Sequence, residues 1–166
     1  DLNFIYKKNS AKNFSKWLEE CRFLKKKLTT VNDSMKQNPI NSYYFTKCLG
    51  EVSHKNSVFV NDAGSSNYVC SQALEIKKNQ REITSGAFYS MGLAVPMAIG
   101  ASASYPKKTI IAITGDGSIE LNIQELRTMS INRLNIKLFV INNGGYASIR
   151  KSQDDMTGGR YTDDEE

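Results

Sequence analysis

Two short motifs decide the fold of this chain: Gly115-Asp116-Gly117-Ser118 and Asn142-Asn143-Gly144-Gly145. The first follows the continuous apolar run 109–114, and the second follows the apolar run 136–141. Runs of this kind are typical of central strands in a parallel sheet. Because ligands of such sheets bind beyond the carboxyl ends of the strands, Asp116 and Asn143 are predicted to converge on one site.

The chemistry of this pair favours a hard cation. A carboxylate, a carboxamide oxygen and a backbone carbonyl are ligands that suit Mg²⁺ or Ca²⁺. So few protein ligands leave Mg²⁺ to complete its coordination with phosphate oxygens and water. Amides at the start of the helix after Asp116, and amides around residues 64–66, are placed to hold that phosphate. The pattern therefore predicts a diphosphate–metal cofactor, whereas a Gly-Asp-Gly without the Asn-Asn would indicate a simple turn.

Strands and helices alternate along the chain. Short apolar or β-branched runs predict strands at 57–61, 82–84, 109–114 and 136–141. Helical spacing of apolar residues predicts helices at 10–30, 40–52, 68–74 and 91–101. A further helix is expected after Ser118, a suitable N-cap, with Ile119, Ile123 and Leu126 on its inward side. Right-handed crossovers then give an α/β fold, a parallel sheet flanked by helices on both faces.

The two ends of the chain differ from its middle. The helix 10–30 carries an apolar stripe that must pack on something, and the polar segment 29–39 indicates a linker after it. From Arg150 onward the chain is polar, and we expect no further strand or helix there. A sheet that ended here would leave an open edge beside the site. We therefore expect the fold to be incomplete at the C-terminus and the chain to be part of a longer polypeptide, or one completed by another chain.

Composition argues against several other functions. The chain has 166 residues, of which 40% are hydrophobic and 23% charged, as in one globular domain with a core. Its net charge is +5, but Lys and Arg are scattered rather than arranged in a basic stripe, which argues against binding to nucleic acid. The apolar segment 87–103 is interrupted by Gly and Pro and is too short to span a bilayer, which argues against a membrane role.

Cysteine usage and the N-terminal residues indicate the compartment. Cys21, Cys48 and Cys70 are odd in number and widely spaced, which favours reduced thiols over a disulfide framework or a zinc site. The N-terminal residues are polar and lack the apolar core of a signal peptide. We therefore expect a cytoplasmic protein.

The two motifs together resemble the signature of thiamine diphosphate-dependent enzymes. The resemblance covers roughly residues 40–160, the pyrophosphate-binding domain of that family. It is closest to the acetolactate synthase-like members, because residues 85–101 resemble their Gly-x-Met-Gly-x-x-x-Pro-x-Ala-Ile-Gly-Ala segment. The resemblance implies that residues 1–39 are the tail of a preceding domain plus a linker, and that residues 40–166 form the pyrophosphate-binding domain.

The resemblance also implies roles for individual residues. Mg²⁺ would be ligated by Asp116, Asn143 and the backbone carbonyl of Gly145. The diphosphate of thiamine diphosphate would be held by Gly64, Ser65, Ser66, Gly117 and Ser118.

Two more residues would contact the thiamine itself. Met91 would lie under it and force its bent conformation, and the carbonyl of Tyr89 would accept a hydrogen bond from the 4′-amino group. The family's usual glycine is replaced by Tyr89 at the second of these positions, a change that a backbone contact tolerates.

Two departures from the family pattern bear on the reaction. Thiamine enzymes of this type take their activating glutamate from a separate pyrimidine-binding domain, which this sequence lacks, so no catalytic residue is assigned here and the chain is expected to be inactive alone. Four residues beyond Gly145, where simple pyruvate decarboxylases carry a glutamate, this chain has the aliphatic Ile149 of the acetolactate synthases. That residue favours carboligation over simple decarboxylation.

The resemblance therefore implies the cofactor-binding part of a carboligase. The full enzyme would decarboxylate a 2-oxo acid and transfer the acyl-anion equivalent to an acceptor, with a pyrimidine-binding domain or subunit as partner in a homodimer or tetramer. A simple 2-oxo acid decarboxylase and a non-catalytic domain that retains the fold are the alternatives. The acceptor and FAD, which would occupy the middle domain, are left unassigned. Arg150 and Lys151 are interpreted as solvated charges, the alternative being contact with an anionic substrate.

Overall fold

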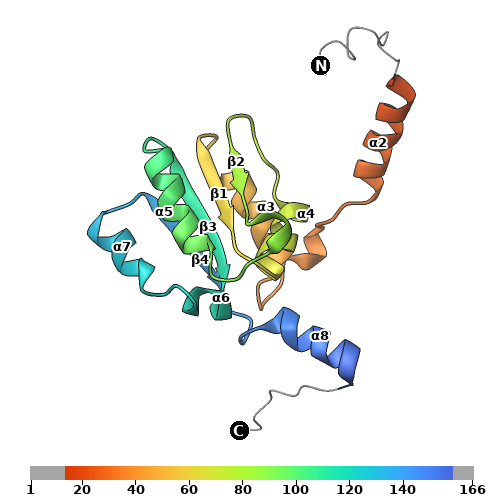
Figure 1. Ribbon diagram of the computed structural model, residues 1–166. Coiled ribbons are helices and arrows are strands. Elements are labelled where there is room, and N and C mark those ends of the chain that lie inside the picture. The colour runs from red at the N-terminus through yellow and green to blue at the C-terminus, as the bar shows by residue number, and fades with distance from the viewer. Residues whose placement is uncertain (1–13, 159–166) are drawn as a thin grey trace, which may run out of the picture.

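A four-stranded parallel sheet forms the centre of the molecule (Figure 1). The computed structural model describes residues 14–158. The strands are β1 (Ser57–Asn61), β2 (Arg81–Ile83), β3 (Thr109–Gly115) and β4 (Ile136–Ile141), in the spatial order β2-β1-β3-β4. All three pairs of neighbouring strands are parallel. The predicted α/β fold is confirmed, and each strand lies within one residue of its predicted bounds.

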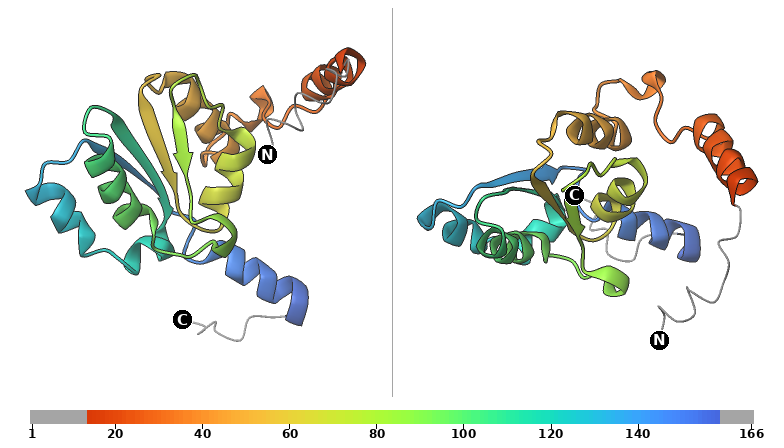
Figure 2. Two further views of the ribbon diagram at one scale, coloured as in Figure 1. Left: turned by 45° about the horizontal axis from the view of Figure 1, so that its top comes forward. Right: turned by 90° about the horizontal axis from the view of Figure 1, so that it is seen from above.

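Helices cover both faces of this sheet (Figure 2). On one face α5 (Ala94–Ser104) packs with Val58, Val60, Ile110 and Ala112, and α7 (Glu125–Ile131) lies beside α5. On the other face α3 (Ser42–Val52) and α4 (Ser65–Ala73) cover Phe59, Ile111 and Ile113. The central strands β1 and β3 are buried on both sides, which is why their sequences are continuously apolar rather than alternating.

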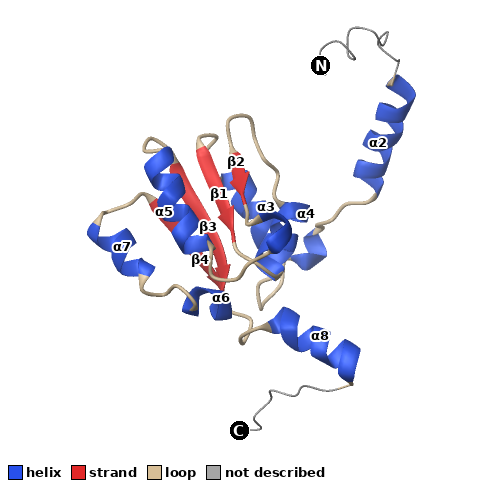
Figure 3. Ribbon diagram, viewed as in Figure 1, coloured by secondary structure: helices blue, strands red, loops and turns tan. Residues whose placement is uncertain are grey.

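The carboxyl ends of the strands meet at one edge of the sheet (Figure 3). The register pairs Gly115 at the end of β3 with Ile141 at the end of β4, so the residues that follow each strand begin side by side. Two helices start beyond these ends: α6 (Asp116–Glu120) after β3, and α8 (Ala147–Thr157) after the loop that follows β4. Short 3-10 turns at Asp33–Met35 and Gly86–Phe88 complete the described elements.

Several predicted helix boundaries are wrong. The helix after β1 begins at Ser65 rather than at residue 68, because Gly64 (φ +60°) turns the chain directly into it. The helix predicted at 91–101 begins at Ala94, because the backbone of Gly92 (φ +80°) is not helical. Ser118 is not an N-cap but lies inside α6, which begins at Asp116.

Two predictions about the C-terminal half are also wrong. Ile123 does not face inward but is 53% exposed, because the chain breaks between α6 and α7 and the helical phase of Ile119 is not continued. The segment after β4 does not lack a helix, since α8 spans Ala147–Thr157. The sequence does not reveal this helix because it is polar. None of the residues of α8 is buried, so the helix needs no apolar stripe.

The helix α2 (Ser15–Lys27) stands away from the sheet (Figure 1). It forms within the predicted range 10–30, of which residues 10–13 lie outside the described part of the chain. No residue of α2 is buried, and Trp17 and Phe23 are 62% and 61% exposed. The predicted apolar stripe is therefore present, but nothing in residues 14–158 covers it. No helix in the same described range is long and apolar enough to cross a membrane.

Cysteine reactivity provides a test of the packing between α4 and the sheet. The three cysteines are free, and Cys70 on α4 is buried against Phe59 and Ile111. Burial raises the pKa of the Cys70 thiol to about 12, so almost none of it is thiolate at neutral pH. We expect Cys70 to resist iodoacetamide in the native protein and to react after unfolding in urea, measured by peptide mass spectrometry. Native-state labelling as fast as that of the unfolded thiol would contradict this packing.

Candidate functional site

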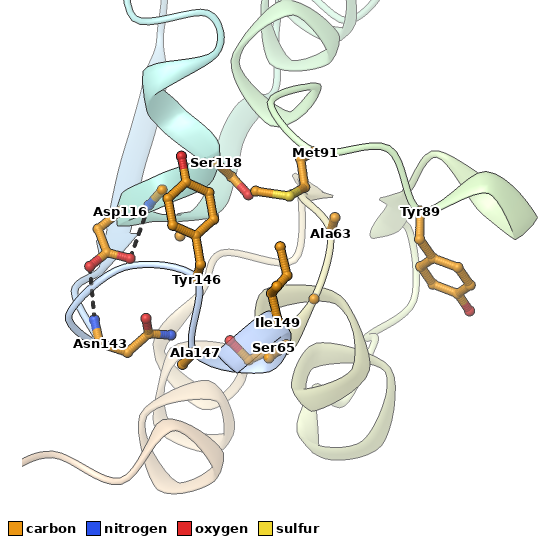
Figure 4. A pocket seen from close by; sticks show the side chains of 14 residues that line it. Ala63, Ser65, Tyr89, Met91, Asp116, Ser118, Asn143, Tyr146, Ala147 and Ile149 are labelled. Carbon is orange, nitrogen blue, oxygen red and sulfur yellow. Dashed lines mark hydrogen bonds between the residues drawn. The ribbon is translucent and has the colours of Figure 1, made fainter. Parts of the chain in front are cut away.

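A cleft of about 210 Å³ opens at the carboxyl edge of the sheet (Figure 4). Four segments line it: the loop after β1 with the first residue of α4, the turn before α5, the end of β3 with the start of α6, and the loop after β4 with the start of α8. The lining residues are Ala63, Gly64, Ser65, Tyr89, Met91, Gly115, Asp116, Gly117, Ser118, Asn143, Tyr146, Ala147, Ser148 and Ile149. Of the ten residues predicted from the sequence to bind the cofactor or metal, all except Ser66 and Gly145 line this cleft.

Asp116 joins the two motifs. Its Oδ2 accepts hydrogen bonds from the amides of Gly145 (2.7 Å) and Asn143 (3.2 Å), and its Oδ1 accepts one from the amide of Gly117 (3.0 Å). Burial would raise the pKa of this carboxyl, but the three backbone donors outweigh burial, so the pKa lies below its ordinary value. Asp116 is therefore ionised at neutral pH and keeps a lone pair of Oδ1 for a cation.

The loop after β4 presents the other metal ligands predicted from the sequence. The side chain of Asn143 extends into the cleft beside Ala147 (Figure 4). Gly144 and Gly145 have φ values of +80° and +76°, a left-handed turn that residues with side chains rarely adopt. The amide of Gly145 faces Asp116, while its carbonyl accepts a hydrogen bond from Arg150.

Arg150 is not the solvated charge that was expected from the sequence. Its Nη1 donates to the carbonyls of Gly144 and Gly145, and its Nη2 lies 3.3 Å from the carbonyl of Asn143. The neighbouring Lys151 does match that expectation, since it is exposed and pairs with Asp155 on the same helix at 2.9 Å.

The loop after β1 supplies the opposite side of the cleft. Gly64 precedes α4, and the first amides of this helix have no acceptor within the helix, which favours an anion in front of them. Ser65 lines the cleft at this helix start. The Ser66 hydroxyl is instead buried and donates to the Ala63 carbonyl at 2.7 Å, so it points away from the cleft.

Met91 and Tyr89 lie on the turn before α5. The Met91 side chain reaches into the cleft toward Ser118, whereas the Tyr89 ring points away from it and is 56% exposed (Figure 4). Tyr89 has left-handed backbone angles, φ 45° and ψ 43°. A glycine adopts this conformation without strain, which gives a physical reason for the glycine that the family resemblance implies at this position.

Asp62 holds the Met91 turn in position and was missed by sequence reasoning. This carboxylate is 2% exposed and accepts four hydrogen bonds. Its Oδ1 accepts from the amides of Ala63 (2.8 Å) and Gly92 (2.9 Å), and its Oδ2 accepts from the amide of Ala94 (3.1 Å) and the hydroxyl of Thr114 (2.9 Å). The available signal was its place directly after a buried strand, the same place that Asp116 has after β3.

Tyr146 is a second residue that the sequence did not single out. Its ring lies against Gly117, where an added Cβ would come within 2.9 Å of the Tyr146 Cε1 atom. Gly117 is therefore needed for close packing as well as for a turn. Ile149, singled out as the aliphatic replacement for a glutamate, lines the middle of the cleft between Ser65 and Met91 (Figure 4).

The donor set fits a cation that shares its coordination with phosphate. Among residues 14–158 no three or more His, Cys, Asp or Glu side chains gather in a way that would hold a metal alone. The site instead offers one carboxylate, one carboxamide and loop carbonyls, which leaves coordination positions for phosphate oxygens. The cleft is also smaller than the roughly 300–1,000 Å³ of a typical ligand pocket, so it encloses only part of a cofactor.

Comparison with known proteins agrees with this geometry. The family model "Thiamine pyrophosphate enzyme, C-terminal TPP binding domain" matches residues 62–166, more than half of the chain. The acetolactate synthase large subunit of Buchnera aphidicola subsp. Schizaphis graminum is 31% identical over 82% of this chain and 24% of its own length. The Corynebacterium glutamicum large subunit is 28% identical over 93% of this chain and 25% of its own length. Isozyme 1 of Escherichia coli is 29% identical over 70% of the chain and 21% of its own length.

The chain thus spans about a quarter of the length of the curated relatives that it matches. The matched region contains the loop after β1, the Met91 turn, the Gly-Asp-Gly start of α6 and the Asn-Asn loop, which are the four segments of the cleft. The chain belongs to the thiamine diphosphate-dependent enzymes, as an acetolactate synthase-like member, and carries their C-terminal cofactor-binding domain.

Proposed function

We propose that the full protein containing this chain is a thiamine diphosphate- and Mg²⁺-dependent carboligase. It decarboxylates a 2-oxo acid and transfers the acyl-anion equivalent to an acceptor. The observation that carries the proposal is the convergence of Asp116, Asn143 and Met91 on one cleft, with the Asp116 carboxylate hydrogen-bonded to the Asn143 loop. Thiamine diphosphate, when bound, supplies the electron sink for breaking the carboxyl bond.

The residues of this chain bind and orient that cofactor. Asp116, Asn143 and the Gly145 carbonyl would hold Mg²⁺, which would supply positive charge for binding the diphosphate. Gly64, Ser65, Gly117 and Ser118, at the helix starts of α4 and α6, would hold the diphosphate, because helix dipoles favour an anion at these starts. Ser66 contributes through its position in the first turn of α4, because its hydroxyl is already bonded to Ala63.

Met91 and Tyr89 complete the cofactor contacts. Met91 would support the thiamine, an assignment that rests on its side chain in the cleft and on the Asp62 hydrogen bond that fixes the Gly92 amide next to it. The Tyr89 carbonyl would accept a hydrogen bond from the 4′-amino group, and the outward-pointing ring of Tyr89 would not obstruct it. Activation of the cofactor requires a glutamate from a pyrimidine-binding domain.

That domain is proposed to lie in the part of the polypeptide outside this chain or in a partner subunit. The length of the relatives, about four times that of this chain, supports the first arrangement. Residues 1–39 are then the tail of a preceding domain and a linker, and residues 40–166 the cofactor-binding domain. The exposed stripe of α2 supports this boundary, since it requires cover that residues 14–158 do not supply. A cytoplasmic homodimer or tetramer is the assembly that we propose.

Ile149 supports carboligation over release of an aldehyde. It places an aliphatic side chain in the middle of the cleft, where no proton donor is then available from this position. Without a proton donor at this position, the site would favour reaction with a second carbonyl compound over protonation. Product analysis of the full-length protein with pyruvate, thiamine diphosphate and Mg²⁺ tests this. We expect acetolactate or another ligation product by mass spectrometry, and free acetaldehyde as the main product would instead indicate a simple decarboxylase.

A further inference from the structure

Three consecutive carbonyls of the loop after β4 face a single cation. Arg150, in the first turn of α8, donates through Nη1 to the carbonyls of Gly144 and Gly145 and through Nη2 to that of Asn143 at 3.3 Å. Such contacts between a guanidinium and several backbone carbonyls replace the interactions that those carbonyls would otherwise make with water or a metal ion. The side chain therefore acts as an internal cation for this loop.

The backbone amides of this loop contact an anion, and its backbone carbonyls contact a cation. The amides of Asn143 and Gly145 donate to the Asp116 carboxylate at 3.2 and 2.7 Å, while the carbonyls of the same two residues accept from Arg150. The left-handed φ values of Gly144 and Gly145 produce the turn that directs these groups. One anion, Asp116, and one cation, Arg150, thus both restrain the conformation of the loop.

We propose that Arg150 and Mg²⁺ compete for the Gly145 carbonyl, so that Mg²⁺ binding displaces the guanidinium. The inference rests on the proposed function, in which this carbonyl is a Mg²⁺ ligand. A guanidinium and a divalent cation on the same oxygen lie within a few ångströms of each other and repel strongly in a partly buried site. Arg150 keeps the loop ordered before metal binding. It lowers the affinity for Mg²⁺, because the metal must displace it from the carbonyl.

The surface of α8 has room for the displaced side chain. No residue of this helix is buried, so the Arg150 side chain can turn from the loop toward solvent by rotation about its own bonds.

Mg²⁺ titrations of the full-length protein in the presence of thiamine diphosphate test the proposal. Arg150→Met removes the internal cation, and we expect the Kd for Mg²⁺ to fall about fivefold to tenfold at 0.15 M salt, measured by calorimetry. Arg150→Lys keeps the charge and is expected to change the Kd less. Lys151→Met is the matched control, because it removes the same charge one residue away, from a side chain that is paired with Asp155 rather than with the loop.

Hydrogen exchange of the metal-free protein gives a second measurement. Without Arg150 the loop loses one of its two restraints, so Arg150→Met is expected to speed exchange of the Asn143 and Gly145 amides about tenfold, while Lys151→Met leaves it unchanged. Equal or weaker Mg²⁺ binding by Arg150→Met, in a protein whose wild type binds Mg²⁺, would overturn the displacement alone. Absence of Mg²⁺ binding in wild type and variants would overturn the proposed metal site, and the displacement with it.

Discussion

Replacing Asp116 with alanine is expected to weaken thiamine diphosphate binding in the presence of Mg²⁺ by about 100-fold or more. The change removes the one carboxylate of the proposed ligand set, and loss of even an outer partner of a metal site costs about 10- to 100-fold in affinity. It also leaves the amides of Gly117, Asn143 and Gly145 without their acceptor, so the loop after β4 is no longer tied to α6. Calorimetry on the full-length variant measures the effect.

A carboxylate on the same helix provides the control. Glu120→Gln removes one negative charge from an exposed residue of α6 that does not line the cleft, and it is expected to leave cofactor affinity within about twofold of the wild type. Circular dichroism establishes that Asp116→Ala is folded. Unchanged cofactor affinity in a folded Asp116→Ala protein would place the metal elsewhere.

Replacing Asp62 with asparagine is expected to lower the free energy of unfolding by about 3 kcal/mol. The carboxylate accepts four hydrogen bonds at a buried position, and a carboxamide nitrogen cannot accept those at the oxygen it replaces. The new NH₂ group would then face two other donors. These are the amides of Ala63 and Gly92 if it replaces Oδ1, or the Ala94 amide and the Thr114 hydroxyl if it replaces Oδ2. Urea unfolding of the full-length protein measures the loss.

The effect of Asp62 is expected to extend to the cofactor. Its Oδ1 fixes the Gly92 amide next to Met91, so the variant should also bind thiamine diphosphate more weakly at temperatures where it remains folded. Asp33→Asn, an exposed carboxylate in a 3-10 turn before α3, is the control and should change stability by less than about 0.5 kcal/mol. If Asp62→Asn also changed the free energy of unfolding by less than about 0.5 kcal/mol, the four hydrogen bonds would not be formed in solution.

The strands and the cleft could be predicted because their signals are local. The buried strands β1 and β3 read as continuous apolar runs, and Asp116 and Asn143 follow strand ends that a parallel sheet must bring to one edge. The helix boundaries depended instead on single backbone angles. Gly64 and Gly92 have positive φ values that no pattern of apolar residues reveals, and α8 has no buried residue to mark it.

Contacts between distant residues account for the other omissions. Asp62 and Thr114 are 52 positions apart in the sequence and meet only because β1 and β3 are neighbours in the sheet. Arg150 was interpreted as a solvated charge because its partners are backbone carbonyls, which have no signature in the sequence. The role of Gly117 in accommodating the Tyr146 ring likewise depends on the tertiary structure.

Calorimetric titration of the full-length protein with thiamine diphosphate, once with Mg²⁺ and once with EDTA, tests the central claim most directly. The cleft has one carboxylate in a set of ligands that suits Mg²⁺, and this set lies opposite two helix starts. In this account the diphosphate binds only together with Mg²⁺. We predict saturable binding with Mg²⁺ and at least about 100-fold weaker binding in EDTA, in line with the loss expected for Asp116→Ala. No binding under either condition, or equal binding in EDTA, would contradict the account.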